Sequence, residues 1–187
     1  MARDYQRDLV TEALYDHLHH ILVKFRLPIR VLTAESCTGG RIAAEFTRRA
    51  GSSAYFWGGI VSYDNEAKVK LLGVRPETLM QFGAVSRETV ESMLAGLSEI
   101  QPGCLCVAVS GVAGPGGGSP EKPVGTVWIG VRYDKVSDIC LYQFSGDRDD
   151  VQSGAVAAAG KMFHKLLGIQ LDPKKCCIAR PRRSRSD

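Results

Sequence analysis

The chain of 187 residues is 44% hydrophobic and 24% charged, a composition typical of one soluble globular domain that is large enough to hold a core. No apolar run approaches the ~18 residues that span a bilayer, and the N-terminus has no apolar signal-peptide core, so we expect a cytoplasmic protein without a membrane partner. The formal net charge of +4 equals that of residues 172–187 alone, which hold two Lys, four Arg and two Asp. Because the remaining chain is neutral, the charge does not indicate nucleic-acid binding by the folded domain.

From the N-terminus, the first expected element is a long amphipathic helix over residues 3–25, where apolar residues recur mostly at three- to five-residue steps. A short strand over 28–32 and a helix over 41–46 follow. Ser36 therefore falls in a strand-to-helix turn, where free backbone N–H groups point at the same spot as the side chain. A nucleophile needs this exposure and these donors. The alternative is that Ser36 or Thr38 simply caps the helix.

The rest of the chain alternates strands and helices until a late hairpin. The expected elements are a strand over 57–63, helices over 66–72, 77–82 and 86–100, a strand over 104–109, a hairpin of strands over 124–133 and 139–144, and a helix over 149–167. Strands separated by helices indicate parallel pairing, and the hairpin adds an antiparallel pair. We therefore expect an α/β fold: a single three-layer domain over residues 1–171, a mixed sheet with helices on both faces, and a basic, disordered tail over 172–187.

Three glycine-marked turns follow expected strands, at residues 36–40, 110–118 and 145–148, and ligands gather at such strand ends in an open α/β sheet. The glycines of the longest turn would let backbone N–H groups approach an anion closely. This turn is neither a Walker loop, since no Gly-Lys-Ser/Thr follows, nor a dinucleotide fingerprint, since no helix opens from it. From the residues alone, a binding loop and a floppy surface loop are both open.

Lys68 and Cys37 are two further candidates for chemistry. Lys68 falls in the first turn of the helix over 66–72, where the helix dipole lowers a lysine pKa by under about one unit. It could act as a base near neutral pH only if it were buried, and otherwise it is a solvated surface lysine. The six cysteines fit no zinc pattern and are expected to be reduced thiols. Cys37 is singled out because a helix N-terminus favours a thiolate.

Several short strings are far more specific together than alone, and they occur in the order of a known family. They are TAESCTGG at 33–40, GSS at 51–53, Tyr63 with NEAK at 65–68, GAVS at 83–86, SGVAGP at 110–115, KPVGTVW at 122–128 and GDR at 146–148. Through them the chain resembles the CinA C-terminal domain family, in the stand-alone form known as nicotinamide mononucleotide (NMN) deamidase. The resemblance covers about residues 8–168.

The resemblance implies an amidohydrolase that converts NMN to nicotinic acid mononucleotide and ammonia in pyridine nucleotide salvage, with no cofactor and no metal. It implies Ser36 as the nucleophile, Lys68 as its base, and Tyr63 as a residue that assists proton transfer or orients Lys68. The implied substrate-binding residues are Cys37, Thr38, Gly39, Gly40, Asn65, Ser110, Gly111, Gly114, Gly116 and Arg148. Among them, backbone N–H groups of 37–40 would hold the oxyanion, and the glycine-rich loop with Arg148 would hold the phosphate. Ser110 stands where relatives often carry Thr, and so keeps the hydroxyl.

Two other interpretations belong to different functional classes. A catalytically silent nucleotide-binding or regulatory module of the same family would keep the fold without turnover, although Ser36, Tyr63 and Lys68 argue against it. A contact of the basic tail with nucleic acid or a partner, through residues 180–185, would weaken steeply with salt. We expect a small-molecule nucleotide as the partner and no nucleic acid, and the sequence is compatible with a homo-oligomer.

Overall fold

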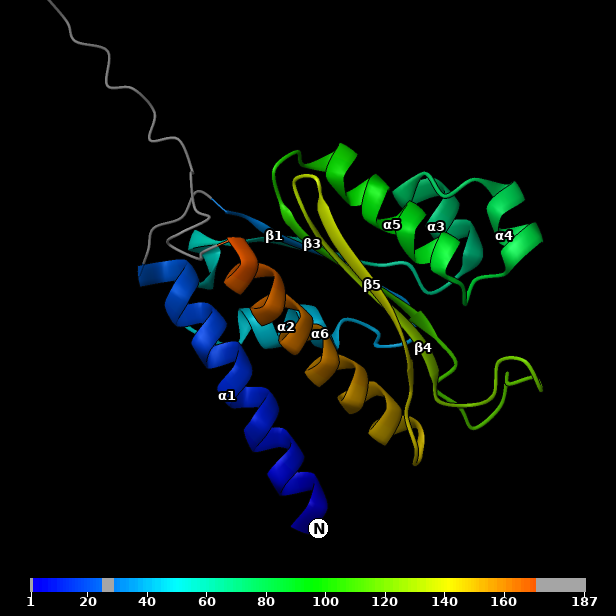
Figure 1. Ribbon diagram of the computed structural model, residues 1–187, viewed down its shortest axis with the longest axis horizontal. Helices are drawn as coiled ribbons and strands as arrows, with labels where there is room; N and C mark the ends of the chain where they lie inside the picture. Colours follow the sequence, from blue (N-terminus) through cyan, green and yellow to red (C-terminus); the bar gives the residue numbers. More distant parts are fainter. Residues whose placement is uncertain (1, 25–28, 171–187) are drawn as a thin grey trace, which may run out of the picture.

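The computed structural model describes residues 2–24 and 29–170, which form one five-stranded mixed sheet between two layers of helices (Figure 1). The strands are β1 Val31–Glu35, β2 Phe56–Val61, β3 Leu105–Gly111, β4 Thr126–Tyr133 and β5 Val136–Gln143, in the spatial order β2-β1-β3-β4-β5. β1 pairs in parallel with β2 and β3, whereas β4 pairs antiparallel with β3 and β5. The predicted α/β class and mixed sheet are confirmed.

Helices cover both faces of the sheet, as the three-layer prediction requires. On one face lie α3 Asn65–Leu72, α4 Pro76–Phe82 and α5 Arg87–Ile100; on the other lie α1 Ala2–Lys24, α2 Arg41–Thr47 and α6 Arg148–Gln170 (Figure 1). A short 3₁₀ helix, Ser52–Ala54, precedes β2. None of the helices in the described ranges combines the length and apolar character needed to cross a bilayer.

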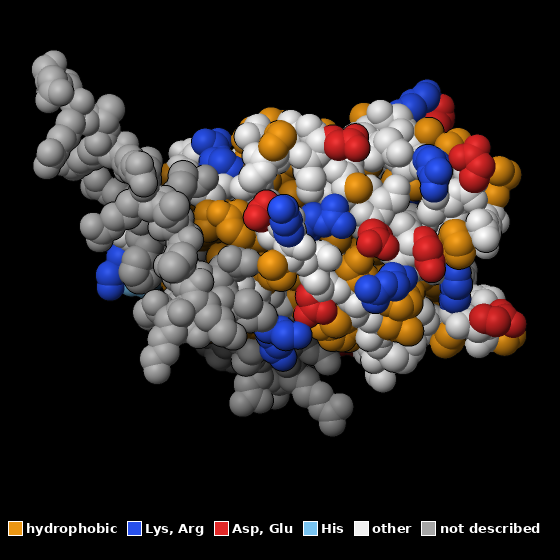
Figure 2. Space-filling view, turned by 45° about the horizontal axis from the view of Figure 1, so that its top comes forward, with side chains coloured by type: hydrophobic (Ala, Val, Ile, Leu, Met, Phe, Trp, Pro, Cys, Tyr) orange, Lys and Arg blue, Asp and Glu red, His pale blue; other side chains and the backbone are white. Residues whose placement is uncertain are grey.

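β1 and β3, two of the inner strands of the sheet, are buried on both faces. Val107 and Val109 of β3 belong to the core under α1, α2 and α6, whereas Cys106 and Ala108 belong to the core under α3 and α5. This explains why β3 is a continuous apolar run rather than an alternating one. On the face shown in Figure 2, acidic and basic side chains of the described residues are interspersed, so this face presents no field of one sign.

The helix ends follow the capping residues that the sequence indicates. The Asp64 carboxylate accepts the Glu66 N–H at 2.7 Å at the start of α3, and Gly73 ends that helix with a φ of 65°. The Ser86 hydroxyl accepts the Thr89 N–H at 3.1 Å at the start of α5. These local signals account for the agreement between predicted and observed helix bounds.

The strands differ more from the prediction than the helices do. β1 extends to Glu35 instead of ending at residue 32, β3 extends to Gly111, and β5 begins at Val136 instead of residue 139. Thr33 and Glu35 are polar but almost fully buried, at 0% and 1% exposure, so polarity was a false signal for the end of β1. Residue 28 and the predicted tail over 172–187 lie outside the described residues.

The parallel strands bring distant segments of the chain to one edge of the sheet. β1 ends before Ser36, β2 ends shortly before Lys68, and β3 ends before the glycine-rich loop. From β1 the chain continues to β2 on one side of it and later to β3 on the other side. The strand order therefore changes direction at β1. Ligands of open α/β sheets bind at such a switch point, outside the carboxyl ends of the strands.

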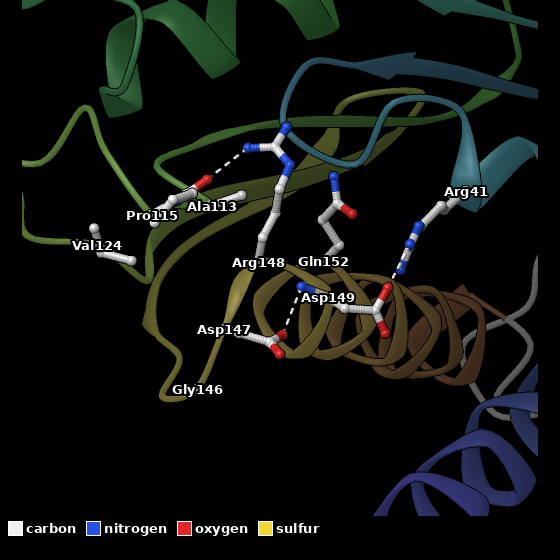
Figure 3. Close-up of a pocket in the computed structure, with 10 residues that line it drawn as sticks. Arg41, Ala113, Pro115, Val124, Gly146, Asp147, Arg148, Asp149 and Gln152 are labelled. Atoms are coloured by element: carbon white, nitrogen blue, oxygen red, sulfur yellow. Dashed lines mark hydrogen bonds and ion pairs between the residues drawn. The ribbon is translucent and has the colours of Figure 1, made fainter.

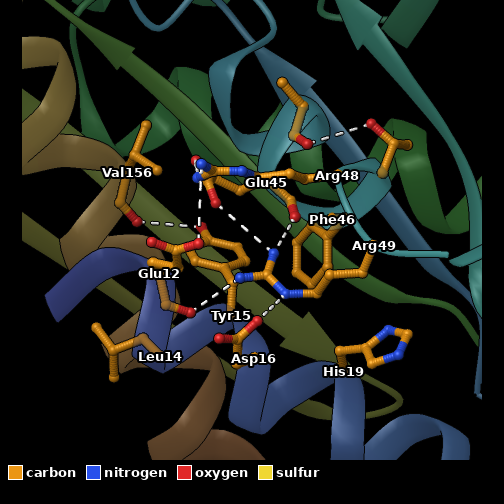
Figure 4. A network of polar contacts seen from close by, with 12 residues as sticks. Glu12, Leu14, Tyr15, Asp16, His19, Glu45, Phe46, Arg48, Arg49 and Val156 are labelled. Atoms are coloured by element: carbon orange, nitrogen blue, oxygen red, sulfur yellow. Dashed lines mark hydrogen bonds and ion pairs between the residues drawn. The ribbon is translucent and has the colours of Figure 1, made fainter. Parts of the chain in front are cut away.

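A polar network around Arg49 ties α1 to α2 (Figure 4). The Arg49 side chain is only 12% exposed. It donates to the Glu12 carbonyl at 2.9 Å, to the Glu45 carbonyl at 2.6 Å and to the Asp16 carboxylate. One guanidinium therefore joins α1 to the helix that follows the Ser36 turn.

Replacing Arg49 by Met keeps the aliphatic stem but leaves two carbonyls and the Asp16 carboxylate without this donor. We expect Arg49→Met to lower the free energy of unfolding by about 2–3 kcal/mol, measured by urea denaturation. The matched control is Arg48→Met, because the Arg48 side chain is 56% exposed and its ion pairs to Glu12 and Glu45 are long, at 3.8 and 3.7 Å. The control should cost less than about 1 kcal/mol, and equal losses in the two variants would contradict the role of Arg49.

Candidate active site

Ser36 is the first residue after β1, and the chain around it forms a tight turn. Its N–H donates to the Val109 carbonyl of β3 at 3.0 Å, and the Gly39 N–H donates back to the Ser36 carbonyl at 3.1 Å. Gly39 and Gly40 have φ values of 61° and 98°, which L residues with a side chain rarely adopt. The two glycines therefore let the chain reverse into α2 and leave Ser36 at the sheet edge.

The Glu35 carboxylate organises this turn from inside the protein. Glu35 is 1% exposed and accepts five hydrogen bonds of 2.7 to 3.3 Å. The donors are the hydroxyls of Thr33 and Thr38 and the backbone N–H groups of Gly40, Ile42 and Ala43. A buried carboxylate is tolerated only when its lone pairs are satisfied, and the first N–H groups of a helix lack acceptors within the helix. The N–H groups at the start of α2 therefore satisfy the buried carboxylate, and the carboxylate supplies the acceptor that these N–H groups lack within the helix.

This arrangement decides between the two interpretations of Ser36. The hydroxyl of Thr38 donates to Glu35, and neither it nor the Ser36 hydroxyl caps α2. The capping alternative is wrong, because Glu35 takes the N–H groups that a cap would take. Sequence reasoning assigned Glu35 no role. The available signal was an acidic residue just before the turn, five to eight residues ahead of the open N–H groups of the next helix.

α3 places Lys68 against the Ser36 hydroxyl. Lys68 is 1% exposed, and its Nζ lies 3.2 Å from Ser36 Oγ. Nζ also donates to the carbonyls of Ser62 at 2.8 Å and Tyr63 at 3.2 Å. Burial lowers the pKa of Lys68 from its usual 10.5, and the nearby Asp64 carboxylate opposes this shift. A solvated surface lysine is therefore the wrong interpretation, since the fold supplies the burial that a neutral amine needs.

Cys37 lies beside Ser36 in a buried position that favours the neutral thiol over the thiolate. It is 4% exposed, and burial raises its pKa to about 12, with the Glu35 carboxylate acting in the same direction. The expectation that this position favours a thiolate is wrong, because burial raises the pKa more than the backbone N–H group of Cys37 lowers it. The Cys37 carbonyl accepts a hydrogen bond from Gln152 Nε2 at 2.7 Å, which ties the turn to α6.

Tyr63 and Arg148 form a bridge over the site. Arg148 Nη2 donates to the Tyr63 hydroxyl at 2.8 Å, and Arg148 Nη1 donates to the Gly114 carbonyl at 2.7 Å. Three segments, namely the end of β2, the glycine-rich loop and the start of α6, thus meet at one guanidinium. Tyr63 contacts Lys68 through its carbonyl, whereas its side chain reaches Arg148.

Two neighbouring pockets open on these residues. The smaller, of about 210 Å³, brings together the predicted residues Ser36, Cys37, Tyr63, Asn65, Lys68, Ser110, Gly111 and Arg148. The larger, of about 790 Å³, is lined among others by Gly114, Arg41, Asp149 and Gln152 (Figure 3). Ala113 and Arg148 line both, so the two pockets are adjacent. Arg41 and Gln152 were not among the predicted residues.

Four predicted residues lie apart from these pockets. Thr38, Gly39, Gly40 and Gly116 line neither of them. The N–H groups of Gly39 and Gly40 already donate within the turn, to the Ser36 carbonyl and the Glu35 carboxylate. Within the described part of the chain, the N–H groups of Cys37 and Thr38 have no such acceptor. Of the turn over 37–40, these two N–H groups are the ones that neither the Ser36 carbonyl nor the Glu35 carboxylate accepts in the described structure.

A mixed sheet with a buried lysine against a serine hydroxyl at its switch point places the chain among α/β proteins with a serine–lysine site. The model of the CinA C-terminal domain family matches residues 12–167. The chain belongs to this family, which confirms the resemblance seen in its sequence.

Relatives with known names agree with this assignment. The chain is 51% identical over 130 residues to nicotinamide-nucleotide amidohydrolase PncC of Escherichia coli strain K12, covering 69% of this chain and 79% of that protein. It is 46% identical over 134 residues to a CinA-like protein of Endomicrobium trichonymphae, covering 72% of this chain and 31% of the relative. The chain thus spans about a third of the length of that longer relative.

Solved structures share the fold over most of the chain. The competence/damage inducible protein CihA from Agrobacterium tumefaciens matches with a TM-score of 0.81 and 39% identity, over 84% of this chain and 96% of that one. The competence damage-inducible protein A from Klebsiella pneumoniae matches with a TM-score of 0.79 and 35% identity, over 84% and 97% of the two chains.

Replacing Glu35 by Gln puts an NH₂ group where the carboxylate accepts N–H donors, so at least one donor loses its acceptor. We expect Glu35→Gln to lower the free energy of unfolding by about 2–3 kcal/mol, measured by chemical denaturation. The control is Glu66→Gln on α3, whose side chain is 69% exposed and pairs with Lys70 at 2.5 Å. This control should cost less than about 0.5 kcal/mol. If Glu35→Gln cost no more than the control, the carboxylate would not organise the turn.

Proposed function

We propose that this chain is a metal-independent amidohydrolase that converts NMN to nicotinic acid mononucleotide and ammonia, as a step of pyridine nucleotide salvage. The observation that carries the proposal is the 3.2 Å approach of the buried Lys68 Nζ to Ser36 Oγ beside a pocket. The substrate class is supported by the Escherichia coli relative, which is 51% identical over the aligned residues and is named a nicotinamide-nucleotide amidohydrolase.

In this proposal Lys68 is a neutral amine when the substrate binds. A neutral amine has two N–H donors and one lone pair, whereas the ammonium form has three donors and accepts nothing. The carbonyls of Ser62 and Tyr63 take two donors, at 2.8 and 3.2 Å. The lone pair is then left for the Ser36 hydroxyl proton, so the two carbonyls orient the base.

The reaction proceeds in two halves. Ser36 Oγ attacks the amide carbon as its proton passes to Lys68, and the oxyanion that forms accepts hydrogen bonds from backbone N–H groups of the turn after Ser36. The Lys68 ammonium then gives its proton to the amide nitrogen, the C–N bond breaks and ammonia leaves. Water then attacks the acyl-enzyme ester as its proton passes to Lys68. The ester C–O bond breaks, the carboxylic acid leaves, and Lys68 returns the proton to Ser36 Oγ.

The pockets suggest how the substrate lies. The amide-bearing ring occupies the smaller pocket next to Ser36, and the sugar and phosphate extend past Arg148 into the larger one. A guanidinium has five N–H donors, of which Arg148 uses one on Tyr63 and one on Gly114. The remaining donors of Arg148 can bind the phosphate, in agreement with the role expected for this residue.

Ser36→Ala removes the nucleophile and Lys68→Met removes the base. The alanine and methionine side chains fit the space that the serine and lysine side chains occupied. Each variant should lower the release of ammonia from NMN by at least about 10³-fold, measured with a coupled ammonia assay without added metal.

Matched controls separate this effect from general damage to the chain. Lys70→Met on the same helix, where Lys70 is 69% exposed and pairs only with Glu66 among the described residues, should keep full activity, as should Ser53→Ala at an exposed serine. Unchanged turnover in Ser36→Ala or Lys68→Met would refute the mechanism. NMN binding without turnover by the unaltered chain would identify a silent nucleotide-binding module instead.

The pH dependence should report Lys68. Because Lys68 must be neutral to accept the proton, kcat/KM for NMN falls as the pH drops below the pKa of Lys68 and levels off above it. Burial lowers that pKa, so the rising limb should lie below pH 10.5. Asp64→Asn keeps a helix cap but removes the carboxylate that raises the pKa of Lys68, and should move the limb to lower pH. A limb that stays in place or moves to higher pH would show that Lys68 is not the base.

A further inference from the structure

On the proposed function, the phosphate end of the substrate lies in the larger pocket. Ala113 and Arg148 line both pockets, so a nucleotide with its amide at Ser36 extends past them (Figure 3). Gln152 Nε2 fixes the α6 wall of the larger pocket to the Cys37 carbonyl. The phosphate therefore meets the first turn of α6 and the start of α2.

Four charged side chains line the larger pocket, and two of them are held in place by other groups. Asp147 caps α6, since its Oδ1 accepts the N–H groups of Asp149 at 2.9 Å and Asp150 at 3.0 Å. Arg148 is fixed by its bonds to the Tyr63 hydroxyl and the Gly114 carbonyl. The carboxylate of Asp147 is thus engaged, and it leaves no open α6 N–H groups at Asp149 and Asp150 for a phosphate.

The other two charged side chains, Arg41 and Asp149, have only each other as partners within the described part of the chain. Arg41 Nη2 lies 2.5 Å from Asp149 Oδ1, and the side chains are 43% and 71% exposed. An exposed pair of this kind contributes about 0–1 kcal/mol, so separating it costs little. A phosphate dianion has a greater charge and three free oxygens, and it competes well with one exposed carboxylate for a guanidinium.

We propose that Arg41 is a specificity-determining residue that binds the phosphate of the nucleotide and gives up Asp149 to do so. In Figure 3, Arg41 and Arg148 approach the pocket from opposite sides of Gln152, one from α2 and one from α6. The phosphate takes the place of the Asp149 carboxylate on the Arg41 guanidinium. Arg41 thereby distinguishes a pyridine nucleoside monophosphate from the corresponding nucleoside, and Asp149 is the counter-ion that occupies Arg41 when no phosphate is bound.

The kinetic test compares NMN with nicotinamide riboside, which lacks the phosphate. Arg41→Ala should raise KM for NMN about 10- to 100-fold with kcat unchanged, because it removes a charge-assisted contact to a group remote from the reacting bond. KM for the riboside should not change. Asp149→Asn should act in the opposite direction and lower KM for NMN several-fold, since Arg41 loses its competing partner. Arg41→Lys should restore part of the affinity.

Arg48→Ala is the charge-matched control, because Arg48 directly follows α2 and lines neither pocket. It should leave both KM values unchanged. An Arg41→Ala variant with an unchanged KM for NMN, or with equal increases for NMN and riboside, would overturn the role of Arg41 while the proposed hydrolysis of NMN still stood.

A binding measurement tests the phosphate site without any turnover. Ribose 5-phosphate is titrated by calorimetry into the unaltered chain and into Arg41→Ala. Binding that is weakened at least about tenfold by the substitution supports the site. Absent binding, or equal binding to both proteins, overturns it. This result holds even if NMN proves not to be hydrolysed, so the two proposals fail separately.

Discussion

Five donors converge on the buried Glu35 carboxylate, and the geometry of the site follows from them. They join the end of β1 to the start of α2 and hold the turn between them, with Ser36 at the sheet edge. They also engage the N–H groups of Ile42 and Ala43 in the first turn of α2. In the described part of the chain, the N–H groups of Cys37 and Thr38 donate neither to Glu35 nor to a backbone carbonyl. A charge that has no part in the proposed chemistry therefore determines which groups are available for it.

Lys68 presents the complementary situation. The acid of Glu35 is satisfied by N–H and O–H donors, whereas the amine of Lys68 is satisfied by the carbonyls of Ser62 and Tyr63. Neither group forms an ion pair with a side chain of opposite charge in the described ranges. For the acid, charged donors are unnecessary because the helix terminus is already electropositive. For the amine, the lack of a paired carboxylate lets burial lower the pKa, which is the condition for a base.

The parts of this fold that local chemistry decides were predictable. The side chains of Asp64 and Ser86 cap the starts of α3 and α5, and Gly73 ends α3 with a left-handed backbone conformation. The bounds of these helices follow from these local features. The end of β1 was not predictable from polarity, because Glu35 is buried by contacts with residues that come later in the chain. The burial of Lys68 also depends on folding, which brings its Nζ to Ser36 Oγ on another strand end, so its lowered pKa is invisible in the sequence. Only the family resemblance paired Ser36 with Lys68, which are 32 residues apart; Arg41 and Gln152 carried no comparable signal.

The thiol of Cys37 has a consequence for the durability of the site. Burial raises the pKa of this thiol to about 12, which disfavours the thiolate at neutral pH. Alkylating reagents and peroxides attack the thiolate, so burial lowers the reactivity of the sulfur atom next to the serine. In the wall of the smaller pocket, Cys37 therefore serves as a small apolar group beside the proposed nucleophile.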